Sequence, residues 1–269
     1  MRGIWIVLLM ILPQLHAYSD ADWDGVEDRF DRCPQTPLSD LVNLEGCTTL
    51  KTQSALHYSL ISGIGYSQVN YASQEKADTT NISLEANIYY NNWQLQGVIS
   101  RYSSDTGTTN ETGMEDSVLN LLYQWPLSEQ MTITPGIGII FPTYKSGYEN
   151  ESTDYSAMLS VEYQFSPTIY GFGGYTYTWV NDTDTPIVKY QNNNSFYAGL
   201  GYVAKSGQEW NCHYNSNKTI YRDSESSRSI GIGFFRQLTP HWFLDGNYDY
   251  GLSDSAGDHS VNVRLGYYF

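Results

Sequence analysis

The chain has 269 residues, of which 41% are hydrophobic and 16% charged, and its formal net charge at pH 7 is −15. This acidity excludes nucleic acid as a favoured partner, because phosphate binding requires a basic surface. Beyond the N-terminus no apolar stretch approaches the roughly 18 residues of a membrane-spanning helix, so hydropathy predicts no transmembrane helix.

Residues 1–17 have the composition of a secretory signal peptide. Arg2 supplies a basic start, nine apolar residues run from Ile4 to Leu12, and the small Ala17 suits cleavage. Because Tyr18 rather than cysteine comes next, nothing indicates a lipid anchor. We therefore expect export into a compartment in which cysteines can pair.

A short acidic segment follows the signal peptide. Residues 18–47 carry eight carboxylates against two arginines, a net charge of −6. Crowded carboxylates repel one another unless a cation neutralises them, and calcium takes about six to eight oxygen ligands around a sharp glycine turn. The expected calcium ligands are Asp20, Asp22, Asp24, the carbonyl of Val26, Asp28 and Asp31.

This spacing, together with "DRCPQTP" and "EGC", resembles a thrombospondin type 3 repeat as found in some Gram-negative outer-membrane proteins. The resemblance covers residues 19–47 and implies a calcium-binding loop module. Asp31 stands where an EF-hand has a bidentate glutamate, and no flanking helices are predicted. Cys33 and Cys47 are expected to form a local disulfide, with Cys212 a lone thiol. A solvated acidic linker is the alternative.

From residue 54 onward the sequence predicts twelve strands with a period of two. Short turns, such as those at 91–92 and 166–167, alternate strictly with long loops rich in Asn, Asp, Ser and Thr. The predicted strands are 55–68, 80–90, 93–103, 117–126, 131–144, 154–165, 168–180, 194–204, 209–220, 227–237, 242–252 and 259–269. An even number of strands with this alternation of turns is typical of a transmembrane β-barrel.

The last predicted strand alternates apolar and polar residues as far as Phe269. A lipid-embedded sheet cannot leave an open edge, so this strand should pair with the first. Its "VNVRLGYYF" also resembles the C-terminal signature of outer-membrane barrels, which implies the barrel assembly machinery as a partner. Two aromatic girdles are predicted, Trp93, Trp125, Phe165, Trp210, Trp242 and Phe269 at the short-turn end and Tyr66, Tyr177, Trp179 and Tyr250 at the other.

Several charged residues fall at inward positions. The predicted lumen-lining residues are His57, Glu85, Glu162, Glu209, His213, Asp245, Asp249 and Arg264. Five acids against one arginine favour cations if water fills the lumen. Two alternatives stay open: an ion-pair network centred on Arg264 that holds the barrel closed, and a lumen filled by Tyr89, Tyr170, Phe172, Tyr197, Phe235 and Tyr268 opposite inward glycines.

Basic residues gather on or near the outward register at the long-loop end. They are Arg101, Lys145, Lys218, Arg222 and Arg228. Such side chains could bind lipopolysaccharide phosphates through charge-assisted hydrogen bonds. Ordinary solvation of the loops is the alternative.

The sequence therefore predicts an all-β protein in three parts: a signal peptide (1–17), a calcium module (18–50) and a single antiparallel transmembrane barrel of about 12 strands (51–269). We expect it in the outer membrane of a Gram-negative bacterium, in contact with lipid and lipopolysaccharide, with its module in the periplasm. The expected function is a small cation-preferring diffusion channel for small solutes. A closed structural or adhesive barrel is the alternative. A lipid hydrolase is a third class, but no nucleophile, base and orienting partner can be assembled.

Overall fold

The computed structural model describes residues 20, 22, 26–28, 30–34, 36, 40–51, 56–70, 76–145, 152–186, 188–204 and 207–269. These residues form strands, turns and loops, and no helix among them has the length and hydropathy to cross a membrane. The predicted signal peptide, Asp24 and Gly25 lie outside the described residues.

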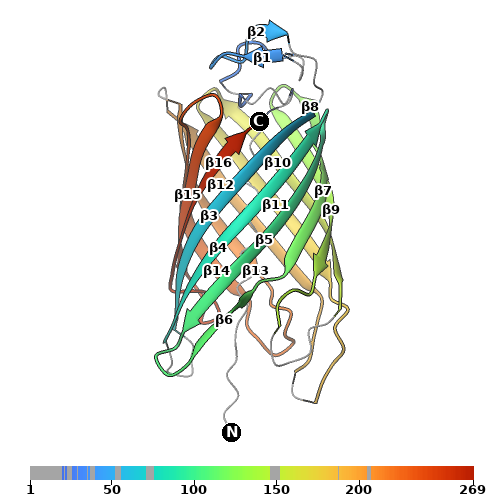
Figure 1. The fold of residues 1–269 in the computed structure, drawn as a ribbon, viewed down its shortest axis with the longest axis vertical. Helices are drawn as coiled ribbons and strands as arrows, with labels where there is room; N and C mark the ends of the chain where they lie inside the picture. The colour runs from blue at the N-terminus through green and yellow to red at the C-terminus, as the bar shows by residue number, and fades with distance from the viewer. Residues whose placement is uncertain are drawn as a thin grey trace.

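The strands form a closed antiparallel ring (Figure 1). They are β3 (Leu56–Asn70), β4 (Lys76–Tyr90), β5 (Trp93–Asp105), β6 (Asn110–Met114), β7 (Ser117–Tyr123), β8 (Trp125–Ser128), β9 (Met131–Phe141), β10 (Asp154–Ser166), β11 (Ile169–Trp179), β12 (Asn193–Val203), β13 (Gln208–Asn217), β14 (Ser227–Gln237), β15 (Trp242–Gly251) and β16 (His259–Tyr268). Since β6, β7 and β8 follow one another at one position of the ring, the barrel has 12 strands. The last strand pairs with the first, from His259 with Gln68 to Tyr268 with Ser59, which confirms the predicted closure.

The predicted strand 117–126 is interrupted at Gln124. β7 and β8 keep one register along β9, with Leu122 opposite Gly136 and Trp125 opposite Ile133. In this register the residue opposite Tyr123 is Pro135, which has no N–H to donate to the ladder. The prediction of a continuous strand was therefore wrong at one position, for a reason that lies in the neighbouring strand.

The predicted loop after residue 103 is largely a hairpin. β5 continues to Asp105 and pairs with β6, and the backbone N–H of Glu115 then donates to the carbonyl of Ser100 at 2.9 Å. Glu115 and Asp116 separate β6 from β7, an irregularity of the kind that re-aims side chains. As a result Glu115, which the sequence placed in a loop, lines the lumen.

The ring places apolar side chains outside and polar side chains inside. Ile64 and Ile137 on the outer face are 66% and 62% exposed, whereas Asn87 and Gln96 on the inner face are each 2% exposed. This is the reverse of a soluble domain and suits a barrel whose outer face contacts hydrocarbon.

Aromatic rings pack in pairs near both ends of the outer face. At the short-turn end, Trp93 packs on Tyr123 and Trp210 on Phe234, each pair with ring centroids 4.8 Å apart. At the long-loop end, Trp179 packs on its strand neighbour Tyr177. Rings at these two levels are suited to lipid headgroups.

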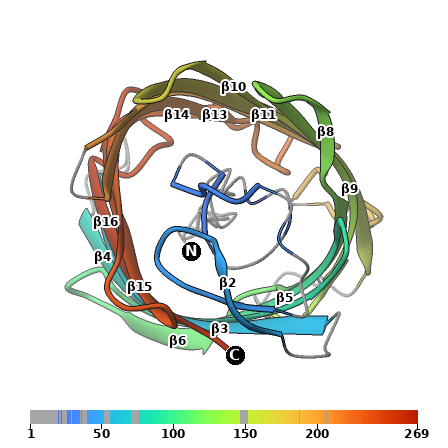
Figure 2. The ribbon, with the colours of Figure 1, turned by 90° about the horizontal axis from the view of Figure 1, so that it is seen from above.

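A small hairpin lies over one mouth of the barrel. It is formed by β1 (Asp40–Val42) and β2 (Thr48–Lys51). Figures 1 and 2 show it at the short-turn end, beside the C-terminus and above the lumen. We call the described residues between 20 and 51 the N-terminal module.

Candidate functional site: the barrel lumen and the N-terminal module

Arg264 occupies the seam at which the barrel closes. It lies opposite Gly63 of β3, and its side chain passes over that glycine, because a Cβ on Gly63 would lie 3.0 Å from Arg264 Cγ. Nη1 lies 3.2 Å from Glu85 Oε2 on β4, and Nε lies 2.8 Å from Asp245 Oδ1 on β15. The two ion pairs thus join β15, β16 and β4, and they cross β3 at the closure.

Side-chain amides extend this network along the lumen wall. Glu85 Oε1 accepts hydrogen bonds from Asn87 Nδ2 at 2.9 Å and from Gln96 Nε2 at 2.8 Å. Gln96 Oε1 in turn accepts from Asn120 Nδ2 at 2.9 Å. Sequence reasoning did not single out these amides, although all three occupy inward positions, because neutral side chains give no charge pattern.

A second polar cluster crosses β14. His213 Nε2 on β13 lies 3.0 Å from Asp249 Oδ1 on β15. The two meet over Gly231, where a Cβ would lie 2.4 Å from His213 Nε2 and 2.6 Å from Asp249 Oδ1. Asn215 Nδ2 also donates to Asp249 Oδ1 at 3.0 Å. In both clusters the contacting side chains lie on strands that are separated by one other strand, and a glycine on that middle strand leaves room for the contact.

The remaining predicted lumen residues also face inward. Glu162 on β10 and Glu209 on β13 are buried, and His57 on β3 is partly buried near the short turns. Beside His57, the Ser59 hydroxyl accepts a hydrogen bond from Asn87 Nδ2 at 3.0 Å. This hydroxyl therefore belongs to the amide network of the wall.

Aromatic rings narrow the lumen towards the short-turn end. The rings in contact are Tyr170, Phe172, Tyr197, Phe235, Phe243 and Tyr268. Inward glycines make room for them: a Cβ on Gly201 would lie 1.9 Å from the Tyr170 ring, and one on Gly174 would lie 2.5 Å from the Tyr197 ring.

Between these rings and the long loops lies a cavity of about 230 Å³. Many of the residues that line it carry a hydroxyl or an amide group, although most of the surface that faces the cavity is apolar; these polar residues include Asn81, Asn120, Ser156, Thr178, Asn217 and Asn262. Ile220 and Tyr221, after β13, and Ala256, after β15, also line it, so the long loops fold inward over the cavity.

The inward-folded loops have a small apolar core of their own. Val188, Tyr190 and Ile220 are 4%, 5% and 7% exposed and pack together. Arg222 Nη2 donates to the Tyr190 carbonyl at 3.0 Å and lies 3.6 Å from Asp184 Oδ2. Arg222, a predicted lipopolysaccharide contact, is thus engaged within the loops.

The other basic candidates differ in their surroundings. Arg228 Nη2 lies 2.6 Å from Glu225 Oε1. Arg101 is exposed on the outer face of β5, and Lys145 is exposed in the loop after β9. Lys218, directly after β13, is partly buried. Arg101 and Lys145 therefore offer the more accessible charges.

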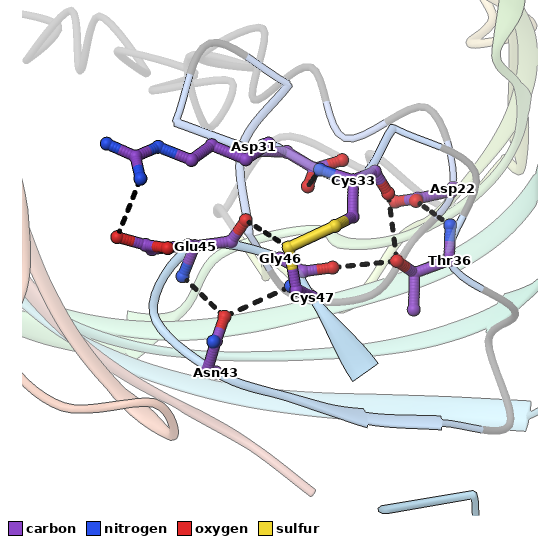
Figure 3. Close-up of a disulfide and its surroundings, with 9 residues drawn as sticks. Asp22, Asp31, Cys33, Thr36, Asn43, Glu45, Gly46 and Cys47 are labelled. Atoms are coloured by element: carbon purple, nitrogen blue, oxygen red, sulfur yellow. Dashed lines mark hydrogen bonds and ion pairs between the residues drawn. A yellow bond between two sulfur atoms is a disulfide. The ribbon is translucent and has the colours of Figure 1, made fainter. Parts of the chain in front are cut away.

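The N-terminal module is held together by one disulfide and by Thr36 (Figure 3). Cys33 and Cys47 are bonded as the sequence predicted. The Thr36 N–H donates to Asp22 Oδ2 at 2.6 Å, and its hydroxyl donates to the Gly46 carbonyl at 2.7 Å. These bonds connect the acidic segment to the "EGC" turn.

Asp31 is the predicted calcium ligand with the clearest surroundings. Its Oδ1 accepts the Cys33 N–H at 2.7 Å, whereas its buried Oδ2 has no hydrogen-bond partner among the described residues. Gly46, with φ of 73°, lies against it, because a Cβ there would be 1.8 Å from Asp31 Oδ1. Burial, and then the nearby carboxylates of Asp22 and Asp28, raise the pKa of Asp31 to about 6. A buried carboxylate oxygen in acidic surroundings fits a hard cation.

The other predicted calcium ligands are only partly defined. Asp20 is 2% exposed and lies within electrostatic range of Tyr89 on the lumen wall, whereas Asp28 and Val26 are half-buried. Among the described residues no group of three or more His, Cys, Asp or Glu side chains is arranged to hold a metal. Asp24, at the centre of the motif, is not among them.

No family model and no curated protein matches the sequence. Among solved structures, an outer membrane channel from Pseudomonas putida F1 is similar, with a TM-score of 0.66, 13% identity, and coverage of 79% of this chain and 95% of that one. The NanC porin gives a TM-score of 0.51 and 17% identity, covering 78% of this chain and 98% of that one. The translocator domain of the autotransporter NalP from Neisseria meningitidis gives a TM-score of 0.51 and 11% identity, covering 81% and 90%. The chain therefore has the fold of an outer-membrane β-barrel.

Proposed function

We propose that this protein is a passive diffusion channel in the outer membrane of a Gram-negative bacterium, that it prefers cations, and that it carries small solutes. The observation that supports this function best is a closed ring with an apolar exterior around a polar interior that contains a cavity. Aromatic rings and folded loops narrow that interior, so a small conductance is expected. The fold is also that of solved proteins described as an outer membrane channel and a porin.

The cation preference rests on the charges inside the ring. The described acids on the inner face include Glu85, Glu115, Asp154, Glu162, Glu209, Asp245 and Asp249, whereas Arg264 is the arginine among the described inward residues. Arg264 offsets part of this charge through its contacts with Glu85 and Asp245. The remaining excess of carboxylates should attract cations into a low-dielectric passage.

Single-channel recording of the refolded protein tests this function. We expect small conductance steps and a reversal potential that favours potassium over chloride in a salt gradient. Replacing Glu162 and Glu209 together by glutamine should reduce the preference, whereas Asp223→Asn, at an exposed loop position, should leave it unchanged. If properly folded protein gives no steps, the alternative of a closed structural or adhesive barrel replaces the channel.

We further propose that the N-terminal module binds calcium on the periplasmic side. Asp31 Oδ2, which has no hydrogen-bond partner among the residues that the structure describes, and the nearby Asp22 and Asp28 carboxylates support this ligand set. In outer-membrane barrels the short turns face the periplasm, and the module lies at that end. Asp31→Asn should abolish the heat of calcium titration of the full refolded protein. Glu45→Gln, which removes an acid paired with Arg32 outside the ligand set, should preserve it. The opposite pattern would refute the assignment.

Lipopolysaccharide binding is proposed for the outer face at the long-loop end. Arg101 supports it best, because its side chain is exposed beside lipid-facing residues of β5. Arg101→Glu should reduce the amount of lipopolysaccharide that co-purifies, whereas Arg236→Glu, outward at the short-turn end, should have no effect. If both variants retain the same amount of lipopolysaccharide, Arg101 does not bind it, and the alternative that water solvates these basic residues holds.

A further inference from the structure

We propose that the barrel cavity binds a small organic cation, a solute that carries one ammonium group on an apolar body. The proposal names the solute class of the channel and rests on that proposed function for the route by which the solute arrives. Two features of the cavity carry it. One is an apolar strip on the wall, and the other is a carboxylate at the edge of that strip whose side-chain partners among the described residues are neutral.

The apolar strip is formed by side chains from four adjacent strands. Val98 on β5 lies directly opposite Val118 on β7, and Val118 lies opposite Ile140 on β9. Opposed side chains on one face of a sheet have Cβ atoms about 4.5–5.5 Å apart, so these three are neighbours. Met158 on β10 extends the strip, because its Cε would lie 3.5 Å from a Cβ on Gly138, two residues before Ile140. All four side chains of the strip line the cavity.

Many polar groups of the cavity wall are turned towards one another. Gln96 Nε2 donates to Glu85 Oε1, and Gln96 Oε1 accepts from Asn120 Nδ2. Asn215 Nδ2 likewise donates to Asp249 Oδ1. Because such hydrogen bonds engage the polar atoms, carbon atoms provide most of the surface that faces the cavity. A surface of this kind favours a solute with an apolar body, since the transfer of apolar groups out of water is favourable.

Glu115 supplies a negative charge at the edge of the apolar strip. It is partly buried and lines the cavity. Its carboxylate accepts hydrogen bonds from the Ser100 hydroxyl and from the Asn81 side chain, and both of these groups are neutral. Ser100 follows Val98 by two residues on β5, so the two side chains lie on the same face of the strand. The carboxylate that Ser100 contacts therefore lies beside the strip.

The arginine at the cavity does not offset the charge of Glu115. Arg264 contacts the carboxylates of Glu85 and Asp245, at 3.2 and 2.8 Å. Asp116, a further acid, lies within electrostatic range of Glu115. An anionic solute would be repelled here, and a neutral apolar solute would remove water from the carboxylate without supplying a counter-charge. An ammonium group supplies that charge, and its apolar body covers the strip.

Rings and volume suit the same class of solute. Tyr197 on β12 and Tyr221 in the inward-folded loops also line the cavity. Cations are attracted to the faces of aromatic rings. The cavity volume of about 230 Å³ is below the roughly 300–1,000 Å³ of pockets for drug-sized ligands, so the solute should be no larger than a single ring with a short side chain.

Calorimetric titration of the refolded protein with three probes tests the proposal, with protein-free detergent as the blank. Benzylammonium carries both a ring and a charge, benzyl alcohol carries the ring alone, and methylammonium carries the charge alone. We expect benzylammonium to bind at least tenfold more tightly than either of the other two, and to interrupt the potassium current in a saturable manner. Equal affinity for benzylammonium and benzyl alcohol would refute the role of charge. Equal affinity for benzylammonium and methylammonium would refute the role of the apolar strip.

Glu115→Gln tests the carboxylate. It should weaken benzylammonium binding roughly ten- to hundredfold, the effect of losing a hydrogen bond to a charged group, and should leave benzyl alcohol binding unchanged. The matched control is Glu111→Gln on β6. Glu111 accepts a hydrogen bond from the Tyr102 hydroxyl at 2.7 Å and is not among the described residues that line the cavity, so benzylammonium binding should stay the same.

Val118→Thr tests the apolar strip, because threonine has nearly the shape of valine but exchanges a methyl group for a hydroxyl. It should weaken the binding of benzylammonium and of benzyl alcohol roughly fourfold each, and it should not weaken that of methylammonium. Val263→Thr, on the outer face of β16, is the control and should change none of the three affinities. The heat-dependent shift in gel mobility verifies that each variant is folded.

Conductance separates failure of the site from failure of the channel. Conductance steps without any heat of benzylammonium binding would overturn the solute site and leave the channel intact. Binding heat that Glu115→Gln removes, in a folded protein that gives no steps, would support the site and refute the channel. If folded Glu115→Gln and Glu111→Gln bind benzylammonium equally well, Glu115 does not recognise the ammonium group and the proposal is wrong.

Discussion

A glycine inside a strand leaves a gap one side chain wide on the inner wall, and two polar clusters use such gaps. Arg264 passes over Gly63 to reach Glu85, and His213 meets Asp249 over Gly231. Without the gap each pair would be separated by the side chain of the strand between them, because neighbouring strands are about 4.8 Å apart. Glycine here costs backbone entropy and in return allows buried polar groups to be satisfied.

Gly231→Ala should therefore destabilise the barrel more than the same substitution at a glycine that has open space beside it. The added Cβ would lie 2.4 Å from His213 Nε2 and 2.7 Å from the Tyr248 carbonyl, and a backbone atom cannot move away cheaply. We expect a loss of about 1–3 kcal/mol in the free energy of unfolding, as overpacking usually costs. Urea unfolding followed by tryptophan fluorescence measures it. The control is Gly97→Ala, whose Cβ would meet nothing closer than 3.9 Å. Equal stability of the two variants would refute this role of Gly231.

The titration of Asp31 predicts how calcium binding depends on pH. Its pKa is raised from 3.8 to about 6, so between these values the folded module without calcium binds more protons than the unfolded chain, and its stability falls as pH rises. Calcium requires the ionised carboxylate, so its affinity should change in the opposite direction. We expect calorimetry to show affinity rising up to about tenfold per pH unit towards pH 6 and then levelling off. Constant affinity between pH 4.5 and 7 would exclude Asp31 as a ligand.

At the scale of elements, the strands could be predicted because each one alternates apolar and polar residues for ten residues or more. The break at Gln124 could not be predicted, because it depends on Pro135 lying opposite Tyr123. The register between two strands cannot be derived from the sequence of either strand alone. Glu115 was missed because the irregularity beside it turns a residue of a polar loop into the lumen. Charged residues at inward positions could be predicted, but the amides that connect them could not, because neutral side chains give no charge pattern.

The long loops show the same limit. Their composition predicted long polar loops, and it did not indicate that some of them fold inward over the lumen. The contact between Tyr190 and Tyr221 joins two loops that are distant in sequence, and no periodic pattern marks such a contact. These loops nevertheless shape the site, because residues beside the contact close over the lumen cavity.

At the scale of the whole molecule, the lumen is narrowed in three places along one axis. The inward-folded loops cover the long-loop mouth, aromatic rings narrow the interior, and the N-terminal module lies over the short-turn mouth (Figure 2). The first two are parts of the barrel itself. The module precedes β3 in the chain, and its Asp20 lies within electrostatic range of Tyr89 on the lumen wall. The disulfide between Cys33 and Cys47 encloses a loop with a sequence separation of 14 and limits how far the module can spread.

Removing the disulfide should therefore widen access to the lumen if ions pass beneath the module. A crosslink across a loop of this length contributes about 3 kcal/mol through chain entropy, a large share of the stability of so small a unit. We expect Cys33→Ser with Cys47→Ser to increase single-channel conductance and current noise. Cys212→Ser removes only the free outward-facing cysteine and should leave both unchanged. A reductant that does not cross the membrane should reproduce the effect when it is added on the short-turn side, and it should have no effect when it is added on the long-loop side. Identical conductance in the double variant and the parent protein would place the module outside the ion path, as a spacer rather than a cover.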